Sequence, residues 1–230
     1  MSIHPISVHW DDMTEKDWDR AMKAIEEAVE RVVLPSVSFI AEEGPDPFRI
    51  LVSTMISLRT KDEVTLPASL RLFAAADSPA AMLKLPEEKI GELIYPAGFY
   101  KTKARHILAV SAILTEKYGG KVPDRREDLM ALPGVGTKTA SLVLALGFGI
   151  DAICVDTHVH RVSNRLGWIT TRTPEESEQA LMKVLPVKYW IPVNELLIFF
   201  GQQICRPQSP FCSRCPFAGT CPRRGVEKSR

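Results

Sequence analysis

Hydrophobic residues recur every three or four positions along most of this chain, which is the spacing of one face of an α-helix. The first such stripe consists of Trp18, Ala21, Met22, Ile25, Ala28, Val29, Val32 and Val33. The second consists of Phe48, Leu51, Val52, Met55 and Ile56, and later stripes lie in residues 86–93, 104–118, 180–184 and 193–200. Alternating patterns typical of strands are scarce. The pattern therefore predicts an all-α fold.

Local signals predict where several of these helices begin and end. Pro86 precedes two glutamates and suits the first turn of a helix. Thr173 is followed by a proline and two glutamates, which is typical of a capped helix start. Gly119 and Gly120 are expected to end the helix over 104–118. Asp124 is a candidate cap for a short helix that ends near Leu132.

The composition is that of a folded globular protein rather than a disordered or membrane-spanning one. The 230 residues suffice for one large domain or two small ones, and 45% of them are hydrophobic and 25% charged. No apolar run reaches the ~18 residues that span a bilayer, and the first residues lack the features of a signal peptide. We therefore expect no membrane partner.

The net charge of +1 hides an asymmetry along the chain. Residues 1–46 carry a net charge of −7, and the remaining residues carry +8. An excess of basic residues over most of the chain is compatible with a polyanionic partner, and equally with an ordinary solvated surface.

Residues 132–140, Leu-Pro-Gly-Val-Gly-Thr-Lys-Thr-Ala, lie between two helical patterns. Glycines two positions apart allow a tight turn and a close approach of the backbone to a ligand. The next helix is expected to start near Thr137, where its free N–H groups and positive dipole end suit a phosphate. The spacing is not that of a P-loop. Without further evidence, the segment also fits a plain corner between two helices.

A second segment, residues 155–166, begins Val-Asp-Thr-His-Val-His-Arg and contains Asp156 directly before a helical pattern. An aspartate in that place is most often an N-cap.

Four of the five cysteines form a cluster near the C-terminal end. They are Cys205, Cys212, Cys215 and Cys221, with six, two and five residues between them. Without a secretory signal, such a cluster indicates a metal site rather than disulfides. Four thiolates can hold either structural zinc or an iron–sulfur cluster, and donor chemistry alone leaves both open. The remote Cys154 is expected to be a small core residue.

Together these segments resemble the endonuclease III-type DNA glycosylases of the helix-hairpin-helix superfamily, from about Arg20 to Cys221. The resemblance rests on the hairpin Leu-Pro-Gly-Val-Gly-x-Lys-Thr-Ala, on the Val-Asp-Thr-His segment and on the cysteine spacing. It implies that Lys138 and Asp156 are catalytic and that the four cysteines hold a 4Fe-4S cluster. It also implies DNA contacts at the following residues: Gly134, Val135, Gly136, Thr137, Thr139 and His158.

The same resemblance implies two helical domains with a DNA cleft between them. Residues 40–150 would form a helical barrel that contains the hairpin, and residues 1–39 and 151–230 would form a discontinuous cluster domain. The expected partner is double-stranded DNA that carries a damaged base or an abasic site.

An enzyme that everts a base must fill the gap left in the duplex. The family does so with a glutamine in a Ser-x-Gln-x-x-Asp segment, where this chain has Ser57-Leu58-Arg59-Thr60-Lys61-Asp62. Arg59 has donors only and cannot reproduce the pairing of glutamine, but it can stack and can contact guanine. In a second loop that resembles the family's, Phe99 is the candidate apolar wedge.

The resemblance therefore implies a bifunctional DNA glycosylase and abasic-site lyase that removes oxidised pyrimidines. Lys138 would attack C1′ as a neutral amine, which requires burial or nearby cations. Asp156 would stabilise the positive charge that develops on the sugar. The alternatives are a damaged-DNA binder that is non-catalytic or of narrowed specificity, which Arg59 keeps open, and a monofunctional mismatch glycosylase. A monomer in the bacterial cytoplasm is the simplest expectation.

Overall fold

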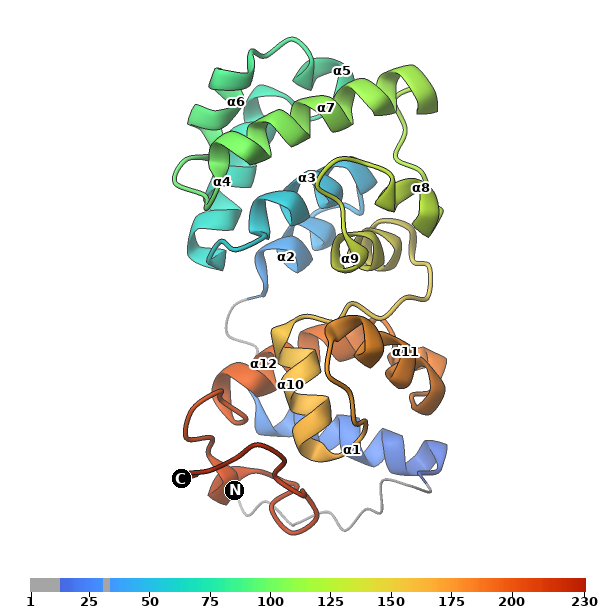
Figure 1. The fold of residues 1–230 in the computed structure, drawn as a ribbon, viewed down its shortest axis with the longest axis vertical. Coiled ribbons are helices and arrows are strands. Elements are labelled where there is room, and N and C mark those ends of the chain that lie inside the picture. The colour runs from blue at the N-terminus through green and yellow to red at the C-terminus, as the bar shows by residue number, and fades with distance from the viewer. Residues whose placement is uncertain (1–12, 31–33) are drawn as a thin grey trace. The chain divides into compact units, whose positions relative to one another are not determined.

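The structure is a computed structural model, and it describes residues 13–30 and 34–230. Within these ranges the chain forms twelve α-helices and no β-strand, which confirms the predicted all-α fold (Figure 1). The helices are α1 (Glu15–Ala28), α2 (Ser36–Glu42), α3 (Pro47–Ser57), α4 (Asp62–Ala75), α5 (Pro79–Met82), α6 (Glu87–Ile94), α7 (Tyr100–Tyr118), α8 (Arg126–Met130), α9 (Thr137–Phe148), α10 (Thr157–Leu166), α11 (Pro174–Val184) and α12 (Pro192–Gln203). Val32 and Val33 of the first stripe lie outside the described residues.

The chain divides into two compact units. One is Leu34–Ala152, and the other combines Met1–Val33, described over residues 13–30, with Ile153–Arg230. We call them the hairpin unit and the cysteine unit. The functional domains 40–150 and 1–39 with 151–230, arranged about a DNA cleft, remain a prediction.

The hairpin unit is built around α3, whose side chains are almost all buried. The helix contacts α2, α4, α7 and α9, so it has little surface left for water. Leu51, Val52 and Ile56 are fully buried, in agreement with the second hydrophobic stripe. At its start α3 lies so close to α9 that a Cβ on Gly147 would be 3.2 Å from the Cα of Pro47. This close packing fixes α9, which carries the candidate lysine.

The cysteine unit has its own hydrophobic core, in which α1 and α10 both contact α12. The first stripe lies on α1, and Trp18 packs edge-on against Trp168 with ring centroids 5.0 Å apart. Phe200 of α12 packs in the same way against Phe217, at 6.2 Å. Because Phe217 lies between two of the clustered cysteines in sequence, this contact fastens their loop to the helical core.

Most of the predicted helix ends agree with the structure. The helix α7 ends at Tyr118 before Gly119, and Thr173 caps α11 by accepting a hydrogen bond from the amide of Glu176 at 3.2 Å. Two predictions are wrong in detail. Pro86 is the N-cap of α6 rather than its first residue, and Arg125 rather than Asp124 precedes α8.

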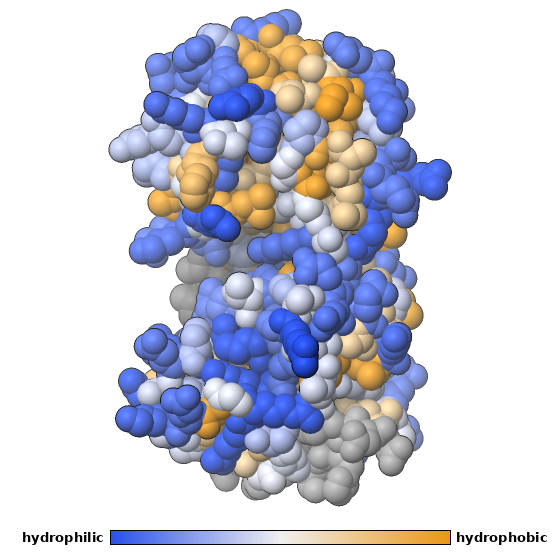
Figure 2. Space-filling view, in the orientation of Figure 1, coloured by the Kyte–Doolittle hydropathy of each residue, from blue (hydrophilic) through white to orange (hydrophobic). Residues whose placement is uncertain are grey.

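The surface that Figure 2 shows is largely hydrophilic, with hydrophobic side chains gathered in small areas. Over residues 13–30 and 34–230, no helix combines the length and apolar character that crossing a membrane requires.

Candidate functional site

The predicted hairpin is present and consists of α8, a turn and α9. Gly134 has a φ of 77°, and a Cβ there would lie 2.5 Å from Nδ1 of His106. Both facts require glycine, since other residues strain at positive φ. Arg126 of α8 donates to the Ser141 hydroxyl of α9 at 3.0 Å, and this hydroxyl donates to the carbonyl of Thr137 at 3.0 Å. The two helices of the hairpin are thus joined by partly buried hydrogen bonds as well as by the turn.

The start of α9 presents backbone donors rather than side chains. The first helical bond runs from the Ala140 amide to the carbonyl of Gly136, so the amides of Thr137, Lys138 and Thr139 precede the helical ladder. Thr139 itself is almost completely buried. These amides and the positive helix dipole suit an anion.

Val135 differs from the other candidates on the hairpin. Its side chain is buried, and its amide donates to the carbonyl of Leu132 at 3.1 Å. Its polar backbone donor is therefore used to close the turn, so Val135 supports the hairpin instead of offering a donor to a ligand.

Lys138 is the second residue of α9, and its side chain is exposed while its neighbours Thr139 and Ala140 are buried. The amine therefore lies on the solvent side of the helix. Lys138 is thus exposed within the hairpin unit, and a neutral amine produced by burial and nearby cations stays a prediction.

Asp156 is the N-cap of α10 in the cysteine unit. Its Oδ1 accepts hydrogen bonds from the amides of His158 and Val159, both at 2.8 Å. The segment before it is fixed by Asn194, which donates to the carbonyl of Cys154 at 2.9 Å. Both amides thus bind the same carboxylate oxygen. The carboxylate is half-buried and is held rigidly at a helix start.

His158 packs between α10 and α12. Nη2 of Arg161 lies 3.1 Å from its Nδ1 and donates to the carbonyl of Gly201 at 3.0 Å. A Cβ on Gly201 would lie 2.6 Å from the same ring nitrogen, so only glycine fits there. These contacts orient the His158 ring directly after Asp156.

The two wedge candidates lie on adjacent turns of the hairpin unit. Arg59 follows α3, Phe99 precedes α7, and both are exposed, Phe99 by 65%. The guanidinium carbon of Arg59 lies 5.7 Å from the centroid of the Phe99 ring, within the range of a cation–π contact. The structure thus brings together two residues that are 40 positions apart in the sequence.

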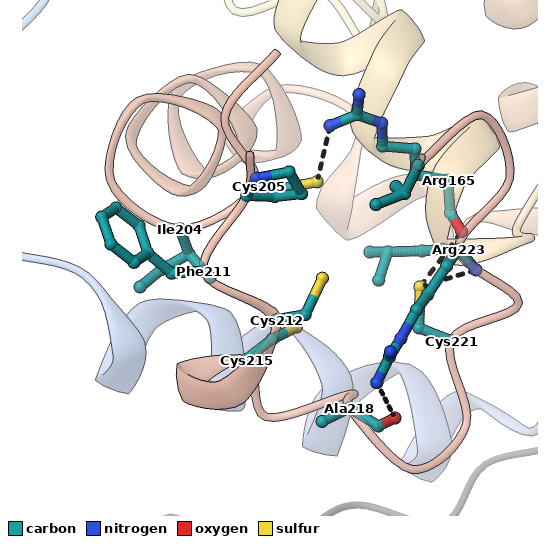
Figure 3. Close-up of a pocket in the computed structure, with 12 residues that line it drawn as sticks. Arg165, Ile204, Cys205, Phe211, Cys212, Cys215, Ala218, Cys221 and Arg223 are labelled. Atoms are coloured by element: carbon teal, nitrogen blue, oxygen red, sulfur yellow. Dashed lines mark hydrogen bonds between the residues drawn. The ribbon is translucent and has the colours of Figure 1, made fainter. Parts of the chain in front are cut away.

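The four clustered cysteines line one pocket that is open to solvent (Figure 3). Cys205 follows α12, Cys212 opens a short 3-10 helix (Cys212–Arg214), and Cys215 and Cys221 follow it. Arg165 of α10 lies 3.8 Å from the sulfur of Cys205, and the amide of Arg223 lies 3.3 Å from that of Cys221. In the described part of the chain, no group of three or more ligating side chains is placed to hold a single metal ion.

Burial raises the pKa of the thiols of Cys205 and Cys221, and raises that of Cys215 to about 12. Without a cation these thiols would stay neutral, whereas a bound metal core makes its thiol ligands thiolates. Four soft sulfur donors around one cavity, with N–H groups directed at two of the sulfurs, are the donor set of a zinc or an iron–sulfur site.

Sequence reasoning missed one residue near the wedge candidates. Lys103 of α7 is only 7% exposed, although lysine is seldom buried. Its partners lie 43 to 47 positions away in the sequence, so no local pattern could have indicated its burial.

Comparisons with known proteins agree on one family. Residues 52–187 match the family model described as HhH-GPD superfamily base excision DNA repair protein. The chain is 51% identical over 188 residues to Endonuclease III of Thermotoga maritima, which covers 80% of this chain and 88% of that protein. It is 44% identical over 178 residues to Endonuclease III-like protein 1 of Mus musculus, which covers 76% of this chain and 59% of the mouse protein.

The fold also matches a solved structure, that of a trapped endonuclease III–DNA covalent intermediate. The TM-score is 0.78 at 34% identity, over 92% of this chain and 97% of the other.

Proposed function

This chain belongs to the endonuclease III family of base excision DNA repair proteins, and we propose on that premise that it is a bifunctional DNA glycosylase and abasic-site lyase for oxidised pyrimidines. The observation that carries the proposal is Lys138 at the start of a helix that follows a Gly-x-Gly hairpin, in a chain 51% identical to a known endonuclease III. A protein that only binds DNA needs no nucleophile at this place.

In this proposal the hairpin binds the DNA backbone. The amides of Gly136, Thr137 and Thr139 bind a phosphate of the damaged strand at the positive end of α9. Contacts to phosphate set the register of the protein without reading sequence. The exposed amine of Lys138 then projects from the same helix turn toward the sugar.

Lys138 carries the covalent step. Its neutral amine attacks C1′, the C1′–N bond of the damaged base breaks, and the base leaves with a proton. The attached nitrogen then loses a proton as the C1′–O4′ bond of the sugar breaks and O4′ takes up a proton, which gives an imine between Lys138 and C1′. The imine makes a C2′ proton acidic, and removal of that proton breaks the C3′–O bond and expels the 3′ phosphate by β-elimination. Because Lys138 is exposed in the free protein, the bound DNA itself must take the amine out of water.

Asp156 supplies negative charge to this reaction. Its carboxylate is held by the amides of His158 and Val159, so it needs no reorganisation when positive charge develops on the sugar. It also accepts the proton that Lys138 loses before its attack.

The four cysteines fit a 4Fe-4S cluster, since they are soft donors around one cavity with the family's spacing. When bound, the cluster would crosslink the loop between α12 and the C-terminal end, and it takes part in no bond change. Three arginines of this loop, Arg206, Arg214 and Arg230, lie 5.2 to 5.7 Å from the Phe211 ring. They give the loop a basic side suited to DNA phosphates.

Purified protein incubated with a thymine-glycol duplex, beside an abasic-site duplex, tests the proposal. Base release and strand cleavage on the first duplex are the expected result. Cleavage of the abasic duplex alone would show that the lyase acts without base excision, and tight binding without cleavage of either would leave a damage-binding protein. We also propose that the protein acts as a monomer in the bacterial cytoplasm, which gel filtration and fractionation would test.

A further inference from the structure

The turns that carry Arg59 and Phe99 are fastened together by one buried side chain, that of Lys103. This lysine lies in the first turn of α7, four residues after Phe99, and it is buried. Its ammonium lies against the turn that follows α3.

The ammonium of Lys103 uses all three of its protons. It donates to the carbonyls of Ile56 and Leu58, both at 2.6 Å, and to the hydroxyl of Thr60 at 2.7 Å. The carbonyls belong to the C-terminal end of α3, where carbonyls lack helical partners. All three partners are uncharged oxygens, and burial lowers the pKa of Lys103 to about 8. At neutral pH the group is thus a cation that holds the end of α3 and the following turn.

Thr60 links this hydrogen-bond network to the second turn, which contains Gly98 and Phe99. Its hydroxyl donates to the carbonyl of Leu58 at 3.3 Å and accepts from the amide of Gly98 at 3.1 Å. A Cβ on Gly98 would lie 2.5 Å from the carbonyl oxygen of Arg59, so the two backbones are in contact. One hydrogen-bond network therefore joins the turn of Arg59 to the residue directly before Phe99.

Both wedge residues have left-handed backbones, with φ of 53° at Arg59 and 57° at Phe99. Such a conformation costs roughly 1–3 kcal/mol for a residue other than glycine and persists only where the surroundings impose it. Here the surroundings are the ammonium of Lys103 and the hydroxyl of Thr60. The two exposed side chains are consequently held side by side before DNA is bound.

We propose that Lys103 is a positioning residue for base eversion, which holds Arg59 and Phe99 as one preformed wedge. This inference rests on the proposed function. Eversion costs a few kcal/mol of lost stacking and pairing. If the wedge is already ordered in the free protein, less of the free energy of DNA binding is lost to ordering the two turns. Lys103 touches neither substrate nor reacting atoms, and it acts through the two turns.

The inference is tested with Lys103→Met, which keeps the length of the side chain, and with Thr60→Val. The second variant removes the hydroxyl that joins Lys103 to the amide of Gly98 and leaves the bonds of Lys103 to the carbonyls of Ile56 and Leu58 in place. Each variant is assayed in single turnover on a thymine-glycol duplex and on an abasic single strand, where there is no stacked partner to displace. We expect base release from the duplex to fall roughly tenfold to a hundredfold, while cleavage of the abasic single strand changes less than about twofold.

Lys117→Met serves as the matched control, because Lys117 is an exposed lysine of the last turn of the same helix. It should leave both rates unchanged. A 2-aminopurine placed opposite the lesion adds a direct readout, since its fluorescence reports unstacking at saturating protein. The Lys103 and Thr60 variants should show a smaller fluorescence rise than the unmodified protein.

An equal loss on both substrates would overturn the inference, because it would show a general structural role for Lys103. Unchanged base release in both variants would overturn it as well. If Lys103→Met does not fold by circular dichroism, Thr60→Val decides by itself. If the unmodified protein releases no base from the duplex, the proposed function fails, and the inference fails with it.

Discussion

Replacing Asp156 by asparagine separates two roles that this residue combines. As the N-cap of α10, Asp156 accepts two amide hydrogen bonds at 2.8 Å. Asparagine caps helices about as well as aspartate, and it loses only the interaction of the charge with the helix dipole, about 0.3–1 kcal/mol. We therefore expect Asp156→Asn to lower the free energy of unfolding by less than about 1 kcal/mol.

The expected effect on base release is much larger. The carboxylate would stabilise the charge that develops on the sugar, and removing one preorganised group of this kind slows reactions by about 10² to 10³, or roughly 2.7–4 kcal/mol. Single-turnover base release from a thymine-glycol duplex measures this loss. Fluorescence anisotropy measures duplex affinity, which should change little, and urea unfolding measures stability.

Asp46 provides the matched control in the hairpin unit. It caps α3 through hydrogen bonds from the amides of Phe48 at 2.8 Å and Arg49 at 3.2 Å. Asp46→Asn should change stability as little as Asp156→Asn does, and it should leave base release intact. If Asp156→Asn instead weakened DNA binding and base release equally, or slowed release no more than Asp46→Asn, the catalytic role of Asp156 would be refuted.

Three further outcomes are expected. Gly134→Ala places a Cβ 2.5 Å from Nδ1 of His106 at a φ of 77°. The variant should lower the free energy of unfolding in urea by more than about 1 kcal/mol and weaken duplex binding measured by anisotropy. Unchanged binding would count against the hairpin as the DNA-binding element. Cys215→Ser should remove the visible absorption of the purified protein and lower its iron and sulfide content, whereas full iron content would speak against Cys215 as a ligand. Burial lowers the pKa of Lys103 from 10.5 to about 8. Between these two pH values the folded protein therefore binds fewer protons than the unfolded chain. The stability of the unmodified protein relative to Lys103→Met should consequently rise from pH 8 to pH 10.5. A fall across that window, measured by urea unfolding, would contradict the assignment.

The sequence predicted those features whose signals are local. The turn at Gly134, the start of α9 at Thr137 and the cap at Thr173 each depend on a few neighbouring residues, and the structure has all three. The helix α4 was not predicted, because Pro67 lies inside it and proline usually interrupts a helix. Pro67 is the sixth residue of α4 and lies beyond Thr65, whose amide already makes a helical bond to the carbonyl of Lys61, so it interrupts the bonded part of the helix.

The features that the sequence could not predict depend on contacts between distant segments. The burial of Lys103 depends on carbonyls more than 40 positions away, and the contact of Arg59 with Phe99 depends on how α3 and α7 pack. The burial of the Val135 side chain could not be predicted either, because the hairpin motif identifies the residue but does not show which of its groups are exposed.

The identity of the nucleophile is the central claim, and borohydride trapping tests it most directly. The protein is incubated with a thymine-glycol duplex in the presence of borohydride, and the reduced adduct is digested and located by mass spectrometry. We expect one adduct, on Lys138, that is absent from Lys138→Ala. An adduct of undiminished yield in Lys138→Ala, or one located on another lysine, would show that Lys138 is not the nucleophile.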